Sequence, residues 1–238
     1  MPAAYRRVIL KVSGEALSGP GGEPLSAQSA DRLALEIKGA ADEGAEIGVV
    51  IGGGNILRGA AAGAAGADRV SSDYAGMVAT LINGIALKSA LARLGVRVRH
   101  MSAIPCGRVA EAYDHSAADA CLASGEIVIF TAGTGNPFFS TDTAAVLRAA
   151  ELGADALLKA TQADGVYDSD PASNPAAVRL ASVTYQQMLE KRLAVMDMTA
   201  VSLAREQSVP LVVFALSTPG NIARAVAGEQ VGTTVKGG

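Results

Sequence analysis

Short apolar runs rich in Val and Ile alternate along this chain with longer stretches in which apolar residues recur at helical spacing. Seven segments are typical of strands: residues 8–12, 47–51, 96–101, 126–131, 155–160, 211–215 and, more weakly, 231–235. Seven are typical of helices: residues 26–43, 72–93, 109–123, 142–152, 184–192, 197–207 and a last one that opens at 218–219. An alternation this regular indicates a mainly parallel sheet covered on both faces. We therefore expect an α/β fold, a three-layer α/β/α sandwich.

No linker or break in composition divides the 238 residues, so we expect residues 1–238 to form a single domain with two lobes. Two segments depart from the alternation. Residues 60–67 consist of Ala and Gly and are expected to form a loop, and residues 164–184 carry turn signals that favour a hairpin or an extended excursion. Aromatic residues make up 4% of the chain, so small aliphatic side chains must build the core.

The charge balance and the cysteines narrow the functional classes. The chain carries 20 Lys and Arg against 23 Asp and Glu, a net charge of −3, which argues against nucleic acid as a partner but not against a single nucleotide. Cys106 and Cys121 are expected to be buried thiols, not a disulfide or metal site. Neither a signal-peptide pattern nor an uninterrupted apolar stretch of about 18 residues is present, so we expect a cytoplasmic protein that does not associate with membranes.

Polar and glycine-rich residues follow four of the expected strands. They are Lys11 with Ser13-Gly14, Gly52-Gly53-Gly54-Asn55 with Arg58, the run from Gly133 to Asp142, and Lys159 with Thr161 and Asp164-Gly165. The carboxyl ends of parallel strands meet at one edge of a sheet, where ligands bind. Lysine is rarely buried without a partner, so Lys11, inside an apolar run, needs a counter-charge. This edge therefore predicts a polyphosphate site.

The physical basis is direct, although each residue also has a plainer interpretation. Glycine turns let backbone N–H groups approach phosphate oxygens, and lysine and arginine neutralise their charge. Asp142 could orient a lysine or hold Mg²⁺, or it could cap a helix; Asp73 could likewise be a cap, and Arg58 could be solvated. His100 and His115 lack a partner acid or nucleophile nearby in the sequence, which favours core or surface positions.

Missing motifs exclude several classes of nucleotide-binding enzyme. The chain contains no G-x-x-x-x-G-K-[ST] motif, which argues against a P-loop kinase, and no G-x-G-x-x-G after its first strand, which argues against a nicotinamide dehydrogenase. Signatures of α/β-hydrolases, zinc proteases and protein kinases are also missing.

Longer motifs resemble one enzyme family over nearly the whole chain. They are residues 11–17 (KVSGEAL), 49–55 (VVIGGGN) with Arg58-Gly59, 101–105 (MSAIP), 131–142 (TAGTGNPFFSTD), 159–161 (KAT), 164–167 (DGVY) and 195–197 (VMD). Together they are similar to the bacterial uridylate kinases of the amino-acid-kinase fold family. The resemblance implies transfer of the ATP γ-phosphoryl group to UMP in pyrimidine nucleotide biosynthesis, with an acceptor-binding N-terminal part and an ATP-binding C-terminal part.

The resemblance also implies roles for individual residues. ATP would be bound by Lys11, Val12, Ser13, Gly14, Gly54, Arg58, Thr161, Tyr167 and Asp170. UMP would be bound by Gly53, Asp73, Thr134, Gly135, Asn136, Pro137, Phe138, Phe139, Ser140 and Thr141. Lys11, Arg58, Asp142 and Lys159 would be catalytic. The two phenylalanines could wall the nucleotide pocket, or one of them could belong to the core.

Cofactor, assembly and regulation follow from the same resemblance. It implies Mg²⁺ that arrives with ATP and is held mainly through phosphates, with no dedicated protein metal site, and a homohexamer that GTP activates and UTP inhibits. The apolar helix at 72–93 is a candidate subunit interface. Residues 19–24 resemble the segment linked to the activator, but Lys88, Arg99 and His115 do not fully match the residue types expected there.

Two alternatives stay open at this point. Another enzyme of the same fold could phosphorylate a carboxylate or carbamate, although such a substrate would not need Asp73 together with residues 133–139. A nucleotide-binding sensor without turnover is the other, and an assay with ATP separates the two.

Overall fold

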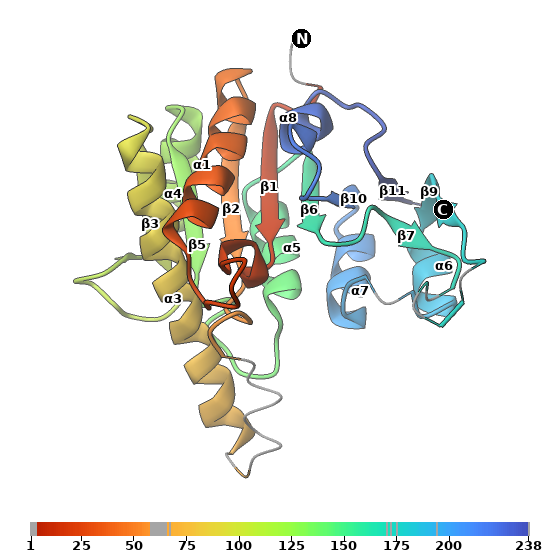
Figure 1. Ribbon diagram of the computed structural model, residues 1–238, viewed down its shortest axis with the longest axis horizontal. Coiled ribbons are helices and arrows are strands. Elements are labelled where there is room, and N and C mark those ends of the chain that lie inside the picture. The colour runs from red at the N-terminus through yellow and green to blue at the C-terminus, as the bar shows by residue number, and fades with distance from the viewer. Residues whose placement is uncertain are drawn as a thin grey trace.

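The computed structural model describes residues 4–57, 66, 68–169, 171, 173–174, 176–193 and 195–237. Within them, a nine-stranded sheet has the order β4-β3-β5-β2-β1-β6-β10-β11-β9 (Figure 1). Its strands are β1 (Arg7–Val12), β2 (Glu46–Ile51), β3 (Val98–Ser102), β4 (Glu111–Ala112), β5 (Ile127–Thr131), β6 (Ala156–Thr161), β9 (Ser182–Thr184), β10 (Leu211–Ala215) and β11 (Thr233–Lys236). All neighbours in it are parallel except β10 and β11. The predicted fold class is confirmed.

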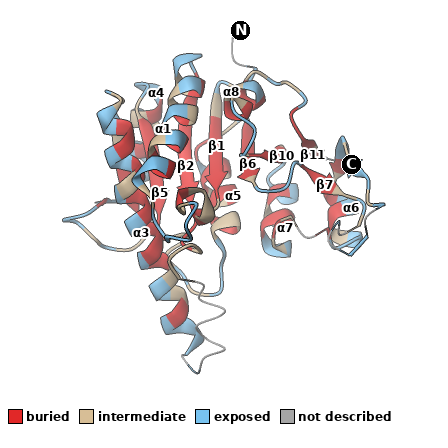
Figure 2. Cartoon of the chain, in the orientation of Figure 1, coloured by how far each residue is buried: buried red, intermediate tan, exposed pale blue. Residues whose placement is uncertain are grey.

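Helices cover both faces of this sheet. One face carries α1 (Ala27–Asp42), α3 (Arg69–Arg93) and α8 (Asn221–Val226), and the other carries α4 (His115–Ala123), α5 (Thr141–Glu151), α6 (Tyr185–Glu190) and α7 (Met198–Glu206). Alternate residues of β1 serve the two cores: Val8 and Leu10 face the first layer, and Ile9 faces the second. The central strands are buried on both sides (Figure 2), as the continuous apolar runs predicted.

The ends of several elements differ from the sequence prediction. The long helix begins at Arg69 and not at residue 72, because the Asp68 carboxylate accepts hydrogen bonds from the backbone N–H groups of Val70 and Ser71. The helix expected over 109–123 begins only at His115, since Glu111–Ala112 pairs with β3 as the edge strand β4. The last helix begins at Asn221 and not at 218–219, after Gly220 in a left-handed conformation.

Other expectations are confirmed or lie outside the described residues. Ser26 caps α1 as expected, and residues 164–184 contain the hairpin of β7 (Val166–Tyr167) and β8 (Arg179–Leu180). A one-turn helix, η1 (Gly14–Leu17), was not anticipated. The loop predicted over 60–67 lies outside the described residues apart from Gly66. Cys106 and Cys121 are free but only half-buried, so the prediction of two buried thiols is wrong.

The long helix α3 explains its own apolar character by packing. By length and composition it could cross a membrane, with a mean hydropathy of 1.4 in its most apolar window, but half of that window is buried inside this molecule. Leu87, Ala90 and Leu91 belong to the core that α3 shares with α1 and the sheet. Helices in the core of a globular protein have this composition.

At Gly84, α3 lies close to the sheet. A Cβ there would lie 2.5 Å from His100 Nε2 and 2.7 Å from Thr131 Cγ2, whereas a Cβ at Gly39 on α1 would have no neighbour within 4 Å. We expect Gly84→Ala to lower the free energy of unfolding by about 1–3 kcal/mol through overpacking. Gly39→Ala, the matched control, should raise it by up to about 1 kcal/mol through helix propensity.

Urea unfolding of the two variants, followed by circular dichroism, tests this prediction. Midpoints that move in the same direction for Gly84→Ala and Gly39→Ala would contradict the close approach of α3 to the sheet.

Candidate functional site

Two lysines and one aspartate meet at the carboxyl edge of the sheet. Lys11 on β1 and Lys159 on β6 are register partners on adjacent parallel strands, so their side chains leave the same face. Asp142, in the first turn of α5, receives both: Lys11 Nζ lies 2.7 Å from Asp142 Oδ1, and Lys159 Nζ donates to Asp142 Oδ2. The exposed fraction of each of these three side chains is 13% or less. The counter-charge that Lys11 needed is therefore Asp142.

The electrostatics of this triad leave an excess of positive charge. Burial alone would raise the pKa of Asp142, but the charges and hydrogen bonds of Lys11 and Lys159 outweigh it and hold that pKa below the usual value. Burial and the neighbouring charge of Lys11 lower the pKa of Lys159, although Asp142 opposes that shift. With one carboxylate between two ammonium groups, the triad is suited to receive an anion.

Asp142 does not cap its helix, which rejects the plainer interpretation of this residue. The cap of α5 is Ser140, whose hydroxyl oxygen accepts from Asp142 N at 3.0 Å and from Thr143 N at 3.1 Å. The same hydroxyl donates to Asp197, which also accepts from the Thr143 hydroxyl at 3.2 Å. Asp197 is the cap of α7, so α5 and α7 are joined at their N-termini beside the triad.

A cavity of about 490 Å³ opens beside the triad. It is lined by Gly53, Gly54, Leu57, Arg69, Asp73, Gly76, Met77, Thr80, Gly133, Phe138, Phe139, Ser140, Thr141, Asp197, Met198 and Thr199. The lining combines two glycine turns, a carboxylate and two aromatic rings. That combination suits a ligand with a phosphate at one end and a flat, polar ring at the other.

Asp73 and the two phenylalanines shape this cavity. Asp73 Oδ2 accepts a hydrogen bond from Phe138 N at 2.8 Å, and Arg69 binds the same carboxylate at 2.8 Å. Asp73 is therefore not a helix cap, a role that Asp68 fills. Phe138 and Phe139 are 68% and 50% exposed, so neither is a core residue. The Arg69 guanidinium lies 5.6 Å from the centre of the Phe138 ring.

A second cavity, of about 340 Å³, lies at the ends of β1, β6 and β10 on the α1 face. It is lined by Ser13, Glu15, Ala16, Ser29, Arg32, Leu33, Glu36, Ala160, Thr161, Gln162, Leu216, Ser217 and Pro219. Two of the residues predicted to bind ATP, Ser13 and Thr161, therefore meet in one cavity. Lys11 and Lys159 stand two residues before Ser13 and Thr161 in the sequence, although no member of the triad lines this cavity.

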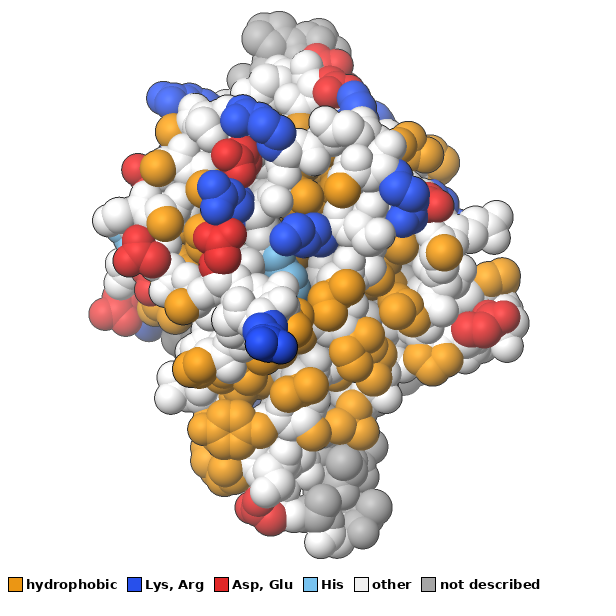
Figure 3. All heavy atoms as spheres, turned by 90° about the vertical axis from the view of Figure 1, so that its left-hand side faces the viewer, with side chains coloured by type: hydrophobic (Ala, Val, Ile, Leu, Met, Phe, Trp, Pro, Cys, Tyr) orange, Lys and Arg blue, Asp and Glu red, His pale blue; other side chains and the backbone are white. Residues whose placement is uncertain are grey.

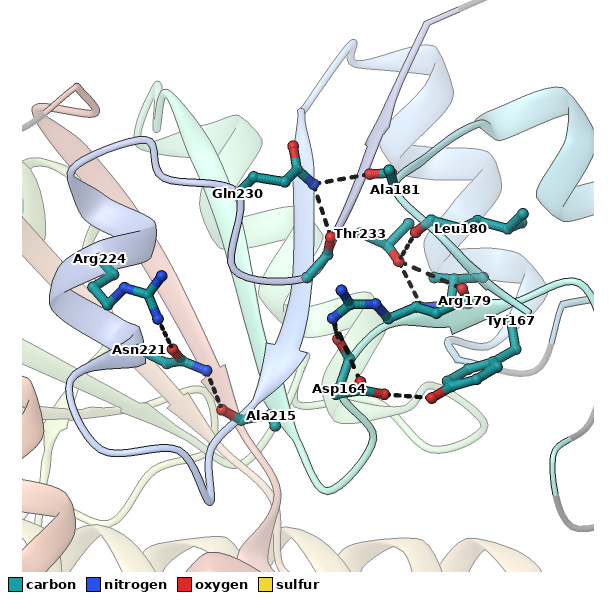
Figure 4. A network of polar contacts seen from close by, with 12 residues as sticks. Asp164, Tyr167, Arg179, Leu180, Ala181, Ala215, Asn221, Arg224, Gln230 and Thr233 are labelled. Carbon is teal, nitrogen blue, oxygen red and sulfur yellow. Dashed lines mark hydrogen bonds and ion pairs between the residues drawn. The ribbon is translucent and has the colours of Figure 1, made fainter. Parts of the chain in front are cut away.

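Tyr167, also predicted to bind ATP, lies on the hairpin beyond this edge (Figure 4). Its hydroxyl donates to Asp164 Oδ1 at 2.7 Å, a hydrogen bond that raises the pKa of the phenol, and the Arg179 guanidinium donates to Asp164 O at 3.1 Å. Thr233 on β11 accepts from Val166 N at 2.8 Å and donates to Leu180 O, so it ties both hairpin strands to the sheet.

The remaining predicted residues are placed as follows. Thr134, Gly135, Asn136 and Pro137 form the turn after β5 but do not line either cavity. Val12 is the last residue of β1, and Gly14 is the first residue of η1. Arg58 and Asp170 lie outside the described residues. Sequence reasoning gave no role to Arg69 or Asp197; Asp197 carried a signal, an aspartate immediately before a helix.

The histidines and the effector candidates are not part of this site. Burial, with a smaller contribution from the charge of Lys88, lowers the pKa of His100 to about 4, and its Nε2 lies 2.9 Å from Thr131 Oγ1. His115 is exposed and contacts Glu151 O. Arg99 is paired on the surface with Glu111 and Glu126. The prediction of core and surface histidines is confirmed.

Comparison with known proteins agrees with the sequence motifs. Residues 6–215 match the model of the amino acid kinase family. A uridylate kinase from Marinobacter nauticus is 51% identical over 232 residues, 98% of this chain and 96% of that protein. The crystal structure of UMP kinase from Bacillus anthracis superposes with a TM-score of 0.94 at 40% identity, covering 99% of this chain and 97% of that one. UMP kinase from Ureaplasma parvum gives 0.91 at 35% identity, with 97% and 98% covered.

The triad predicts a pH-dependent loss of stability when its carboxylate is removed. In Asp142→Asn the two buried ammonium groups lose the carboxylate that both of them contact, so the free energy of unfolding should fall by about 3–5 kcal/mol near neutral pH. Burial already lowers the pKa of Lys159 in the wild type, and without Asp142 to oppose that shift it lies further below the value in the unfolded chain. The unfolded chain binds more protons, so the stability of the variant rises with pH and its deficit relative to wild type narrows.

Urea midpoints of wild type and Asp142→Asn at about pH 7 and about pH 9.5 measure this difference. Asp42→Asn is the control, because Asp42 forms an exposed pair with Lys38 on α1 that should contribute about 0.5 kcal/mol or less. A deficit for Asp142→Asn that is the same at both pH values would show that the two lysines are not charged partners of Asp142.

Proposed function

This chain belongs to the amino acid kinase family and phosphorylates UMP, and we propose from this premise how its site performs the transfer. The observation that carries the proposal is the Lys11–Asp142–Lys159 triad. In the sequence, Asp142 directly follows Thr141, which lines the larger cavity. The two lysines shortly precede Ser13 and Ala160, which line the smaller cavity. One nucleotide in each cavity would bring its phosphates to the same positive group.

The reaction is in-line transfer of the γ-phosphoryl group of ATP to the 5′-phosphate of UMP, giving UDP and ADP. The acceptor oxygen is already anionic near neutral pH, because the second pKa of a phosphate monoester is about 6. No general base is needed, so positioning and charge stabilisation carry the catalysis. Lys11 and Lys159 neutralise the charge on the transferred group, and Asp142 holds both ammonium groups in place. Arg58 remains a predicted third cation.

The larger cavity would hold UMP. Asp73 is a poor neighbour for a phosphate but a good acceptor for ribose hydroxyl groups, so it would lie at the nucleoside end, with Phe138 and Phe139 as walls. Gly53 and residues 140–141 line the same cavity beside the triad and would lie at the phosphate end. Residues 134–137 would close the turn over the nucleotide.

The smaller cavity would hold part of ATP. Residues 11–14, of which Ser13 lines this cavity, and Gly54, which lines the larger one, would supply backbone N–H groups and the Lys11 ammonium to the phosphates, as at other glycine-rich anion sites. Thr161 would contact the nucleoside, and Tyr167, fixed by Asp164, would lie at its outer side.

Mg²⁺ is proposed to arrive with ATP. The Asp142 carboxylate is engaged by two lysines, so the ion would be held mainly by phosphate oxygens, the hard ligands that Mg²⁺ prefers. When bound, it neutralises charge on the β- and γ-phosphates. This arrangement fits the residues of the site, because Lys11 and Lys159 would stabilise the phosphate charge that the ion does not neutralise.

Assembly and regulation also belong to this proposal. Tyr74, Val78, Ile82 and Ile85 recur at helical spacing on α3 and are 41–48% exposed, and Figure 3 shows hydrophobic side chains gathered over the lower half of this face. Such a patch supports a subunit interface, as expected for a hexamer. Activation by GTP, inhibition by UTP and a cytoplasmic location remain predictions.

An acceptor panel tests the assignment of substrate. ADP release, with ATP and Mg²⁺ present, is measured with UMP, CMP, dUMP, acetylglutamate, glutamate, aspartate and carbamate. We expect rapid turnover with UMP. Turnover only with a carboxylate or carbamate would contradict the roles given to Asp73 and residues 134–141. Tight nucleotide binding without turnover would instead indicate a sensor.

Removal of one triad lysine tests the proposed mechanism. Lys11→Ala should lower kcat by about 10²-fold or more, the usual effect of losing a donor that stabilises transition-state charge. Lys38→Ala, which removes a lysine paired with Asp42 on the outer surface of α1, is the control and should leave kcat unchanged. A kcat within a few-fold of wild type in Lys11→Ala would show that Lys11 does not stabilise the transferred group.

A further inference from the structure

The long helix α3 contains a fully buried asparagine that faces the triglycine turn, Gly52–Gly54. Asn83 is 0% exposed, and its side-chain amide donates to Gly52 O and to Asn55 Oδ1, both at 2.7 Å. Burying an amide is costly unless its hydrogen-bonding groups are satisfied. Here both donated bonds are made to the residues that begin and follow the turn.

Asn55 extends this contact away from the helix. Its amide donates to Pro24 O at 2.6 Å and to Asn83 Oδ1 at 3.1 Å. The two side chains therefore form a reciprocal amide pair, which we call the Asn55–Asn83 clamp. The clamp joins the turn after β2 to α3 on one side and to the segment that precedes α1 on the other.

The clamp also limits how closely the turn at Ser13–Gly14 and the triglycine turn approach each other. A Cβ on Gly14 would lie 2.2 Å from Asn55 Oδ1 and 2.8 Å from Gly52 O, so η1 packs directly against the clamp. Gly52 N donates to Val12 O at 3.0 Å, which continues the pairing of β1 with β2 into the turn. A rotation of the Asn55 side chain or a shift of Gly52 would therefore displace residues 13–14 relative to the triglycine turn.

The same face of α3 supports the acceptor cavity. Thr80, less than one turn before Asn83, accepts a hydrogen bond from Ala132 N at 2.7 Å, and a Cβ on Gly53 would lie 2.7 Å from Gly76 O. Asp73 binds Phe138 N. Asn83 is thus the last of a row of α3 residues that contact the loops around the site.

We propose that Asn83 is a positioning residue for phosphoryl transfer: through Gly52 and Asn55 it fixes the triglycine turn relative to Lys11 and Gly14. This inference rests on the proposed function, in which both turns meet phosphates. Asn83 lines neither cavity and acts only through the backbone that it holds. Misplaced N–H groups weaken contacts to the transferred group more than they weaken binding of either nucleotide, so kcat falls more than KM rises.

Asn83→Asp gives a readout that a purely structural role would not produce. The aspartate has the shape of asparagine, but its ionised form cannot donate to Gly52 O, whereas its protonated form can. Burial raises the pKa of such a carboxyl toward neutrality. We therefore expect the ratio of variant kcat to wild-type kcat to rise by about 10-fold or more as the pH falls from about 8 to about 6.

Two further variants complete the experiment. Asn83→Ala removes the donor at every pH and should show a reduced kcat with no recovery at low pH. Ser72→Ala is the matched control, because Ser72 is also buried on α3 and its hydroxyl makes no hydrogen bond within the described part of the chain. It should retain wild-type kcat. Thermal melting confirms that each variant is folded at the assay temperature.

The outcomes distinguish a failure of the positioning role of Asn83 from a failure of the proposed function. Wild-type chain that does not phosphorylate UMP overturns the proposed function. Wild-type turnover together with folded Asn83→Asp and Asn83→Ala proteins of normal kcat overturns the positioning role. So does a kcat ratio for Asn83→Asp that does not change with pH, since the loss would then be independent of the bond to Gly52 O.

Discussion

Two buried ammonium groups on adjacent strands need a carboxylate between them, and much of the architecture at the functional edge meets that need. Lys11 and Lys159 are register partners of β1 and β6, so their backbone positions cannot separate without disrupting the sheet. Asp142 reaches them because Ser140 caps α5 at this edge, and Asp197 binds Ser140 in turn. The charge at this edge is therefore held by groups on secondary-structure elements and not on loops, as the proposed phosphoryl transfer would require.

Much of this arrangement could be predicted from the sequence, because it follows from parallel strands. The apolar runs gave the strands, and parallel packing placed Lys11, the triglycine turn and Lys159 at one edge. A lysine in a buried strand also demanded a partner. The choice between Asp142 as a cap and as that partner could not be made from the sequence, since Ser140 is an equally good cap two residues earlier.

What could not be predicted depends on contacts between residues distant in sequence. Asn83 lies 31 residues from Gly52, and nothing in an apolar helix pattern shows which polar residue faces the sheet. The sequence also does not show which of two nearby aspartates caps α3. Asp68 is the cap, and Asp73 instead binds Phe138 N. The edge strand β4 has two residues and carries no periodicity that could be recognised.

One helix, α3, connects the site to the outer surface of the molecule. Its inner row contacts both the triglycine turn and the segment after β5, and its outer row, which contains Val78 and Ile82, is the exposed apolar stripe. A subunit packed on that stripe would restrict the helix that positions the site. Restriction alone is not regulation, however, because coupling between sites needs an element with two arrangements that each ligand favours differently. The close packing of Gly53 and Gly84 against their neighbours leaves α3 little room for a second arrangement by itself. An effector that acts through this interface would therefore have to move α3 together with the sheet edge it contacts.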